Sequence, residues 1–197
     1  MTYVLGLTGS IGMGKSTTAG FFREESIPVW DADEAVHRLY GKGGEAAPKI
    51  AAVWPKAVHD GQVDRAELKR WIAEEPDALK ILEEIVHPLV AKDRAAFLES
   101  HKSAGLVVLD IPLLFETGGD ARMDGVLVVS AHADIQRKRV LERDTMTPEM
   151  FESILSRQMP DAEKRKRADF VIETRELEQT RADVKTLIAK LTGEPHA

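Results

Sequence analysis

One stretch near the start of the chain has the composition of a phosphate-binding loop. It fits the spacing G-x-x-x-x-G-K-[ST], and a predicted strand precedes it while a predicted helix follows, which disfavours an ordinary glycine-rich turn. Glycines let successive backbone N–H groups surround an anion, and the lysine adds charge for the β and γ phosphates. The serine hydroxyl suits Mg²⁺. The pattern predicts a nucleoside triphosphate site formed by Gly9, Ile11, Gly12, Met13, Gly14, Lys15, Ser16 and Thr17.

A pair of aspartates lies at the C-terminal end of the strand predicted over residues 27–31. Phosphoryl transfer to a hydroxyl needs a base within hydrogen-bond reach of the attacking oxygen. Asp33 is the candidate for that base, and Asp31 stands two residues before it. The alternative is that both carboxylates cap the helix that begins near Glu34, a favoured role for Asp.

A third carboxylate ends the apolar strand predicted over residues 106–111. Asp110 stands where an acid of this kind can hold Mg²⁺ through water. It could instead start a turn, since Asp favours that position. Glu116 is the alternative acid of this neighbourhood.

Basic residues recur on one face of a helix predicted after residue 132. Gln136, Arg139 and Arg143 are spaced i, i+3, i+7, so two guanidinium groups could close over a triphosphate as a lid. The alternative is a solvated, ion-paired face. The run 164–167, Lys-Arg-Lys-Arg, is predicted to face solvent.

The strands that must position these residues alternate with helices. Short apolar runs predict strands, and helical spacing fills the segments between most of them. Such alternation predicts an α/β fold with a parallel sheet and helices on both faces. The strands are expected at residues 3–8, 27–31, 106–111, 125–129 and 170–173, with helices at 15–25, from about 34 to 40, in three short pieces within 132–168, and at the C-terminal end.

The segment from residue 45 to 103 is almost entirely helical in pattern. Prolines at 48, 55, 76 and 88 and the Asp60-Gly61 turn predict breaks between several helices. We therefore predict a core of residues 1–40 and 104–197, with a lid at about 132–168, and an inserted helical lobe of residues 41–103. Residues 193–197 are expected to fray.

Composition excludes several classes of protein. With 27 Lys and Arg against 33 Asp and Glu, the net charge of −6 argues against a general nucleic-acid binder. The chain has no cysteine, and no asparagine for the guanine-reading motif of regulatory GTPases. Apolar runs are too short to span a bilayer. We expect a soluble, cytoplasmic protein that does not bind membranes.

The order of its motifs makes the chain resemble the dephospho-coenzyme A kinases. The resemblance covers almost the whole chain and rests on Leu7 through Ser16, Asp31-Ala32-Asp33, Asp64-Arg65-x-x-Leu68, Leu82 through His87-Pro88, Pro112 through Glu116, Gln136 through Arg139, Arg143-Asp144, and Arg157-Gln158-Met159-Pro160.

The resemblance implies an ATP- and Mg²⁺-dependent kinase with a P-loop NTPase fold of three layers. The sheet order would be 2-3-1-4-5, numbering the five predicted strands along the chain. Such a kinase phosphorylates the ribose 3′-hydroxyl of dephospho-CoA, as a monomer or weak homo-oligomer. It implies Asp33 as catalytic base, Lys15, Arg139 and Arg143 at the transferred phosphate, Ser16 and Asp110 at the metal, and Asp33, Arg65, His87, Pro112, Leu113 and Leu114 at the acceptor.

Departures from the family pattern leave other activities open. Ser10 and Met13 occupy unconstrained loop positions, but Thr174 and its neighbours stand where the family often has an asparagine near a glycine. Any base contact made by that asparagine must be replaced or lost. The alternatives are a P-loop kinase of another small alcohol and a nucleotide-binding switch without a catalytic base.

Overall fold

A computed structural model describes residues 2–193, so the expected fraying of residues 194–197 lies outside the described chain. The chain divides into two compact units. The first comprises the residues up to Trp30 and from His101 onward, and the second is Asp31–Ser100. We predicted boundaries after residues 40 and 103. The first boundary falls earlier because α2 (Ala32–Tyr40) packs against α5 (Ala78–Ser100), within the second unit.

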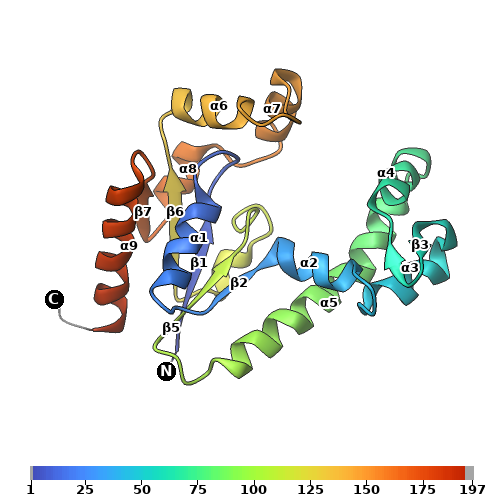
Figure 1. Ribbon diagram of the computed structural model, residues 1–197, viewed down its shortest axis with the longest axis horizontal. Coiled ribbons are helices and arrows are strands. Elements are labelled where there is room, and N and C mark those ends of the chain that lie inside the picture. The colour runs from blue at the N-terminus through green and yellow to red at the C-terminus, as the bar shows by residue number, and fades with distance from the viewer. Residues whose placement is uncertain (1, 194–197) are drawn as a thin grey trace. The chain divides into compact units, whose positions relative to one another are not determined.

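A five-stranded sheet forms the centre of the first unit (Figure 1). Numbered among themselves, its strands have the predicted order 2-3-1-4-5. The pairs β1–β5, β1–β6 and β6–β7 are parallel. In spatial order the strands are β2 (Val29–Asp31), β5 (Leu106–Asp110), β1 (Tyr3–Thr8), β6 (Gly125–Ser130) and β7 (Phe170–Glu173).

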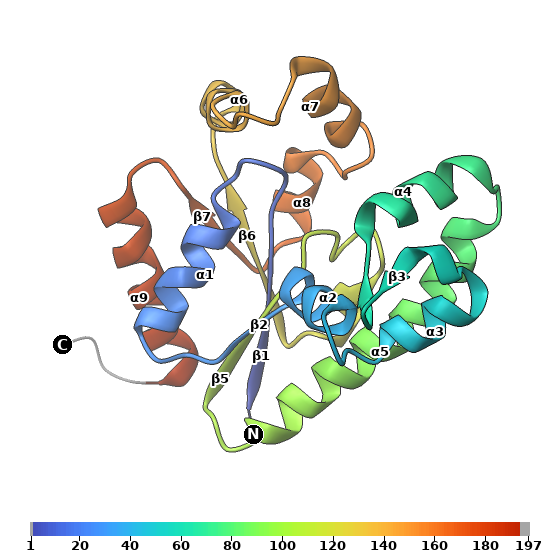
Figure 2. The same ribbon diagram turned by 45° about the vertical axis from the view of Figure 1, so that its right-hand side comes forward.

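Both faces of this sheet are buried, as the continuous apolar strands predicted. Side chains alternate between the faces along β6. Leu127 and Val129 pack in the cluster that includes residues of α1 (Lys15–Glu24) and α9 (Leu177–Thr192). Val126 and Val128 pack on the other face, against the segment after β5. Helices α1 and α9 lie side by side in both views (Figures 1 and 2).

The three short helices predicted between residues 132 and 168 are present. They are α6 (Ala133–Leu141), α7 (Pro148–Leu155) and α8 (Asp161–Arg167). Thr147 caps α7 by accepting a hydrogen bond from the Met150 amide, and Pro148 occupies the first helical position, where its missing N–H costs nothing. A short 3₁₀ turn, η2 (Gly119–Arg122), was not predicted.

The second unit is mostly helical but holds a hairpin that the sequence did not predict. Its further elements are α3 (Ala46–Val53), the 3₁₀ turn η1 (Pro55–Ala57), β3 (Val58–His59), β4 (Gln62–Val63) and α4 (Arg65–Glu74). Strands β3 and β4 are antiparallel around Asp60-Gly61, where both residues have positive φ angles of 50° and 76°. This is the geometry that a two-residue hairpin turn requires.

The predicted break before Pro88 is wrong, because α5 runs through it. A proline removes one helical hydrogen bond, but Leu82, Val86 and Leu89 lie on one face and are all buried in the same cluster. The apolar stripe thus continues across the proline and keeps both halves in one helix. Within residues 2–193, no helix has the length and apolarity needed to cross a bilayer.

Candidate active site

The phosphate-binding loop connects β1 to α1 and takes its shape from glycines. Gly12 and Gly14 have φ angles of 77° and 87°, which other residues adopt only with strain. At Gly9, a Cβ atom would lie 2.7 Å from the carbonyl oxygen of Val129 on β6. No side chain caps the start of α1. The backbone N–H groups of the first turn therefore remain available to an anion.

Met13 fastens this loop to the sheet. Its side chain is 3% exposed, its sulfur accepts a hydrogen bond from the Ala131 amide at 3.0 Å, and its carbonyl accepts one from Thr174 Oγ1 at 2.7 Å. The sequence placed Met13 at an unconstrained loop position. In the structure its backbone lines the loop while its side chain is part of the core.

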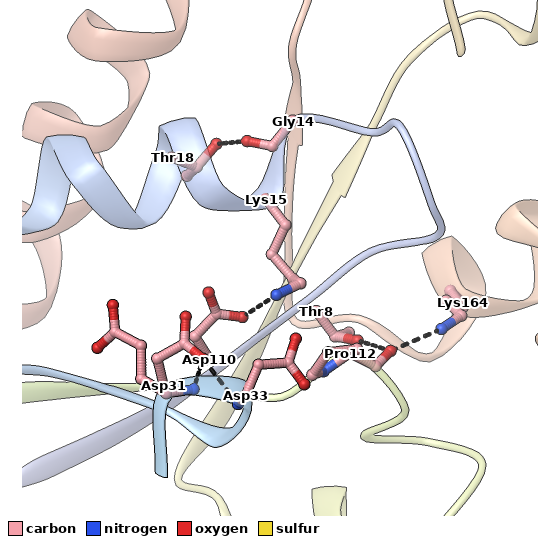
Figure 3. Close-up of polar contacts among 10 residues, drawn as sticks. Thr8, Gly14, Lys15, Thr18, Asp31, Asp33, Asp110, Pro112 and Lys164 are labelled. Atoms are coloured by element: carbon pink, nitrogen blue, oxygen red, sulfur yellow. Dashed lines mark hydrogen bonds and ion pairs between the residues drawn. The ribbon is translucent and has the colours of Figure 1, made fainter. Parts of the chain in front are cut away.

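Lys15 and Asp110 form an ion pair at the carboxyl end of the sheet (Figure 3). Asp110 ends β5 and is fully buried, while the Lys15 side chain is 15% exposed. The residues predicted for the phosphates and for Mg²⁺ are thus adjacent. Ser16 and Thr17 follow Lys15 on α1 and are both exposed. The site offers a cation, a carboxylate and a hydroxyl beside free backbone donors.

A cavity of about 210 Å³ adjoins the loop on its other side. Arg139 and Arg143 line it, and the remaining lining residues are Gly12, Gly14, Thr17, Thr174–Leu177 and Thr180. Arg139 donates to Thr174 Oγ1 at 2.9 Å and to the Thr174 carbonyl. Its guanidinium is therefore held beside the segment after β7. Arg137, by contrast, pairs with Glu152, as a solvated helix face would.

Thr174 joins three parts of this site. Its buried hydroxyl donates to the Met13 carbonyl and accepts from Arg139, and its amide donates to the Ser130 carbonyl at 2.8 Å. Within residues 173–176, where the family often has an asparagine, the Thr174 hydroxyl thus bonds to protein groups on both sides. The sequence drew attention to this position but did not predict these contacts.

Lys164, which the sequence interpretation placed in solvent, is a buried residue next to the site. Its three basic neighbours at 165–167 are exposed as predicted, but Lys164 itself is fully buried. Its Nζ lies 2.8 Å from Glu116 Oε1 and 3.5 Å from the Pro112 carbonyl, which also accepts a hydrogen bond from Thr8 Oγ1 (Figure 3). Thr8 directly precedes the phosphate loop, so these contacts join the loop to the segment after β5.

Glu116 belongs to this hydrogen-bond network, and the acid that pairs with Lys15 is Asp110. Burial by itself raises the pKa of the Glu116 carboxyl. The hydrogen bonds from Lys164 and the Met159 amide and the charge of Lys164 outweigh this, so the pKa lies below its ordinary value. The carboxylate stays ionised and holds Lys164 in place.

The three acceptor residues predicted at 112–114 differ in exposure. Leu113 is 42% exposed, whereas Leu114 is fully buried in a cluster with Phe115, Val126 and Val128. The Pro112 carbonyl is occupied by the contacts described above. Only Leu113 of this segment presents a large side chain to solvent, so the side chain of Leu114 serves packing.

In the second unit, Asp31 and Asp33 have different surroundings. Asp31 caps α2, because its Oδ1 accepts from the amides of Asp33 and Glu34 at 2.8 and 3.0 Å (Figure 3). The capping alternative therefore holds for Asp31. Asp33 is exposed and lines a cavity of about 450 Å³ with Glu34, His37, Arg38 and Arg65.

A second cavity of about 580 Å³ lies beside the hairpin of this unit. Arg65, His37 and Tyr40 line it together with Gly41, His59, Asp60 and Gln62–Asp64. The Arg65 guanidinium lies 5.7 Å from the centre of the Tyr40 ring. Burial raises the pKa of the Tyr40 hydroxyl, while the charge of Arg65 lowers it less, so the net shift is upward. His87 is exposed in the middle of α5, directly before Pro88.

Comparison with known proteins agrees with this architecture. The model of the dephospho-CoA kinase family matches residues 3–179. The dephospho-CoA kinase of Jannaschia sp. (strain CCS1) is 58% identical over 192 residues, which cover 98% of both chains. That of Cereibacter sphaeroides is 59% identical over 95% of this chain and 94% of its own.

Solved structures show the same fold. A Thermus thermophilus protein described as TT1252 superposes with a TM-score of 0.80 and 37% identity, over 96% of this chain and 98% of its own. A dephospho-CoA kinase from Campylobacter jejuni has the same fold, with a TM-score of 0.69, 24% identity and coverage of 96% and 97%. From the match to the family model and the identity to its members over nearly the full length, the chain belongs to the dephospho-CoA kinase family.

Proposed function

We propose that this protein transfers the γ-phosphoryl group of ATP to the ribose 3′-hydroxyl of dephospho-CoA, giving coenzyme A and ADP. The observation that carries the proposal is the pairing of Lys15 with Asp110 beside a glycine-shaped loop, in a chain of the dephospho-CoA kinase family. A cation and an acid next to free backbone donors suit the positioning and charge neutralisation on which phosphoryl transfer depends.

ATP would bind with its phosphates on the loop from Gly9 to Thr17. Lys15 would bind the β and γ phosphates, because its ammonium carries three N–H donors on a flexible stem and can turn from Asp110 toward them. The exposed Ser16 hydroxyl and the Asp110 carboxylate are hard oxygen donors that fit Mg²⁺, which usually takes its other ligands from phosphate and water. When bound, Mg²⁺ would neutralise charge on the β and γ phosphate oxygens.

Arg139 and Arg143 would act at the nucleotide. The cavity of 210 Å³ reaches from Gly12 and Gly14 to the segment after β7, which suits a nucleoside leading away from the phosphates. Arg139 is already held at Thr174, so it would face the nucleoside side of ATP. Arg143 makes the better candidate for the charge near the transferred phosphate.

Asp33 would accept the proton of the 3′-hydroxyl as the oxygen attacks. Its carboxylate is exposed and Asp31 performs the capping, so Asp33 is free for chemistry. Arg65, which lines both cavities of the second unit, suits an anionic group of dephospho-CoA. The exposed His87 and Leu113 and the backbone of Pro112 complete the proposed acceptor contacts, with Leu114 fixing that segment from the core.

A coupled assay for ADP release tests the proposal. With MgATP and dephospho-CoA we expect turnover, with a product that co-elutes with authentic coenzyme A and carries its new phosphate at the 3′ position by phosphorus NMR. Without acceptor, ADP release should be low, because a kinase of this kind keeps water away from the γ-phosphate and so hydrolyses ATP slowly. Shikimate and nucleosides serve as matched alternative acceptors. Equal ADP release with and without dephospho-CoA, or faster turnover of another acceptor, would contradict the proposal.

The proposed reaction requires no partner besides ATP and dephospho-CoA. The expected cytoplasmic location and the expected monomer or weak homo-oligomer stay predictions of the sequence.

A further inference from the structure

Two glutamines bind the backbone of a single residue in the phosphate loop. The Ile11 amide donates to Gln158 Oε1 at 3.0 Å, and the Ile11 carbonyl accepts from Gln136 Nε2 at 2.8 Å. Gln136 lies on α6 and is 6% exposed, while Gln158 lies in the turn between α7 and α8. Both therefore come from the segment predicted as the lid.

The two contacts have opposite polarity. Gln158 acts as acceptor and Gln136 as donor, so the peptide groups on both sides of the Ile11 Cα have their directions set by side chains. The next residue is Gly12 in a left-handed conformation, and a Cβ there would lie 2.4 Å from Val140 Cγ2 and 3.0 Å from the Gln136 carbonyl. Helix α6 thus packs directly on the backbone of the loop, at the point where the loop turns.

We propose that Gln136 and Gln158 are positioning residues that hold the phosphate loop in its anion-binding shape and couple it to segment 132–168. The inference rests on the proposed binding of ATP to this loop. Holding the loop in one conformation lowers the entropy that must be lost when the phosphates bind. Because such coupling is reciprocal, ATP on the loop should in turn stabilise α6 and the turn that carries Gln158.

The test compares Gln136→Met and Gln158→Met with the wild-type protein, using calorimetric titration of MgATP. Methionine has a similar length but neither donates nor accepts these bonds well. We expect the Kd for MgATP to rise by about 5- to 10-fold in each variant, as expected for one backbone hydrogen bond. Gln179→Met is the matched control, because Gln179 lies on α9 and its side-chain amide donates to Asp183 on the same helix at 2.8 Å. It should bind MgATP as the wild type does.

Hydrogen exchange distinguishes the proposed coupling to ATP binding from a purely structural role of the two glutamines. In the wild type, MgATP should slow exchange across α6 and residues 156–160, and this protection should be lost in the two variants while the rest of the first unit keeps its own. Wild-type affinity in both variants, or unchanged protection, would overturn the inference. If the wild type itself bound no MgATP, the proposed function would fail instead, so the two failures are distinguishable.

The polarity of the contacts provides a second test on the ligand-free protein. Gln158→Glu keeps an acceptor for the Ile11 amide, whereas Gln136→Glu replaces a donor with a carboxylate that faces a carbonyl. The thermal midpoint should fall clearly in Gln136→Glu and little in Gln158→Glu. An equal fall of the thermal midpoint in both variants would show that the glutamines do not have the assigned donor and acceptor roles, and would overturn the proposal.

Discussion

Lys164 and Glu116 form an ion pair of 2.8 Å in which the lysine has no exposed surface and the glutamate side chain keeps 16%. A buried ion pair of this kind adds little to the stability of the folded protein compared with well-packed apolar side chains. Removing one partner is costly, however, because the other is left as a buried charge without compensation. The Pro112 carbonyl lies on the other side of the ammonium. The pair therefore holds the segment after β5 in place.

The first prediction concerns the loss of this lysine. Lys164→Met should lower the free energy of unfolding by about 3–5 kcal/mol, because Glu116 is left buried and charged. Urea unfolding measures this. Lys166→Met on the same helix is the control, since Lys166 is 71% exposed and its pair with Glu163 should be worth less than about 1 kcal/mol. The double variant Lys164→Met with Glu116→Leu should recover much of the loss. A small effect of the single change would contradict the buried pair.

The second prediction is the pH dependence of stability. The pKa of Glu116 is lower in the folded protein than its ordinary value near 4.5, so the folded state binds fewer protons. The resulting stabilisation is complete above the unfolded pKa and is lost as the pH falls through the folded pKa. Glu116→Gln should flatten the acid limb of the curve of unfolding free energy against pH. Identical acid limbs in variant and wild type would contradict this.

The third prediction concerns Lys15. Lys15→Ala should abolish measurable turnover, because the triphosphate loses its cation and Asp110 keeps a buried charge without Lys15 beside it. Lys15→Ala with Asp110→Asn removes that charge as well. It should regain stability in urea unfolding but not activity. Normal turnover in the single variant would mean that the loop does not hold the phosphates.

The fourth prediction separates Asp31, which ends β2, from Asp33 in the first turn of α2. Asp33→Asn should lower kcat by about 100-fold or more with the Kd for ATP little changed, because an amide cannot take the proton. Its stability should stay near that of the wild type. Asp31→Ala should instead lower the unfolding free energy by about 1 kcal/mol, since it removes the cap of α2. Unchanged turnover in Asp33→Asn would exclude it as the base.

These sites differ in how far the sequence could predict them. The loop from Gly9 to Ser16 and the apolar strands β5 and β6 are local patterns, and the structure has them where the sequence placed them. Lys164 gave no such signal, because its burial depends on Glu116 and Pro112, which are 48 and 52 residues away in the chain. A run of four basic residues looks alike whether one of them points inward or none does.

The same reasoning explains the errors in the second unit. Proline at 88 predicted a helix end from local chemistry, but a continuous buried face decided the outcome. The hairpin of β3 and β4 has two residues in each strand, which are too few to show an alternating pattern of apolar and polar residues. Its only signal was Asp60-Gly61, which marked the turn but not the strands around it.

The fifth prediction concerns Thr174, which lies in the segment 173–176 where the family often has an asparagine near a glycine. Its hydroxyl holds the Met13 carbonyl and Arg139 together. Thr174→Val keeps the shape but removes both bonds, so the Kd for MgATP should rise by about 10-fold or more. Thr174→Ser keeps the hydroxyl and should stay within about twofold of the wild type. Thr192→Val on α9 is the control, because the Thr192 hydroxyl bonds within its own helix, to the Ile188 carbonyl at 2.9 Å. If Thr174→Ser weakened binding as much as Thr174→Val, keeping the hydroxyl would not preserve the affinity for MgATP, and the hydroxyl bridge between Met13 and Arg139 would not be what holds the loop for binding.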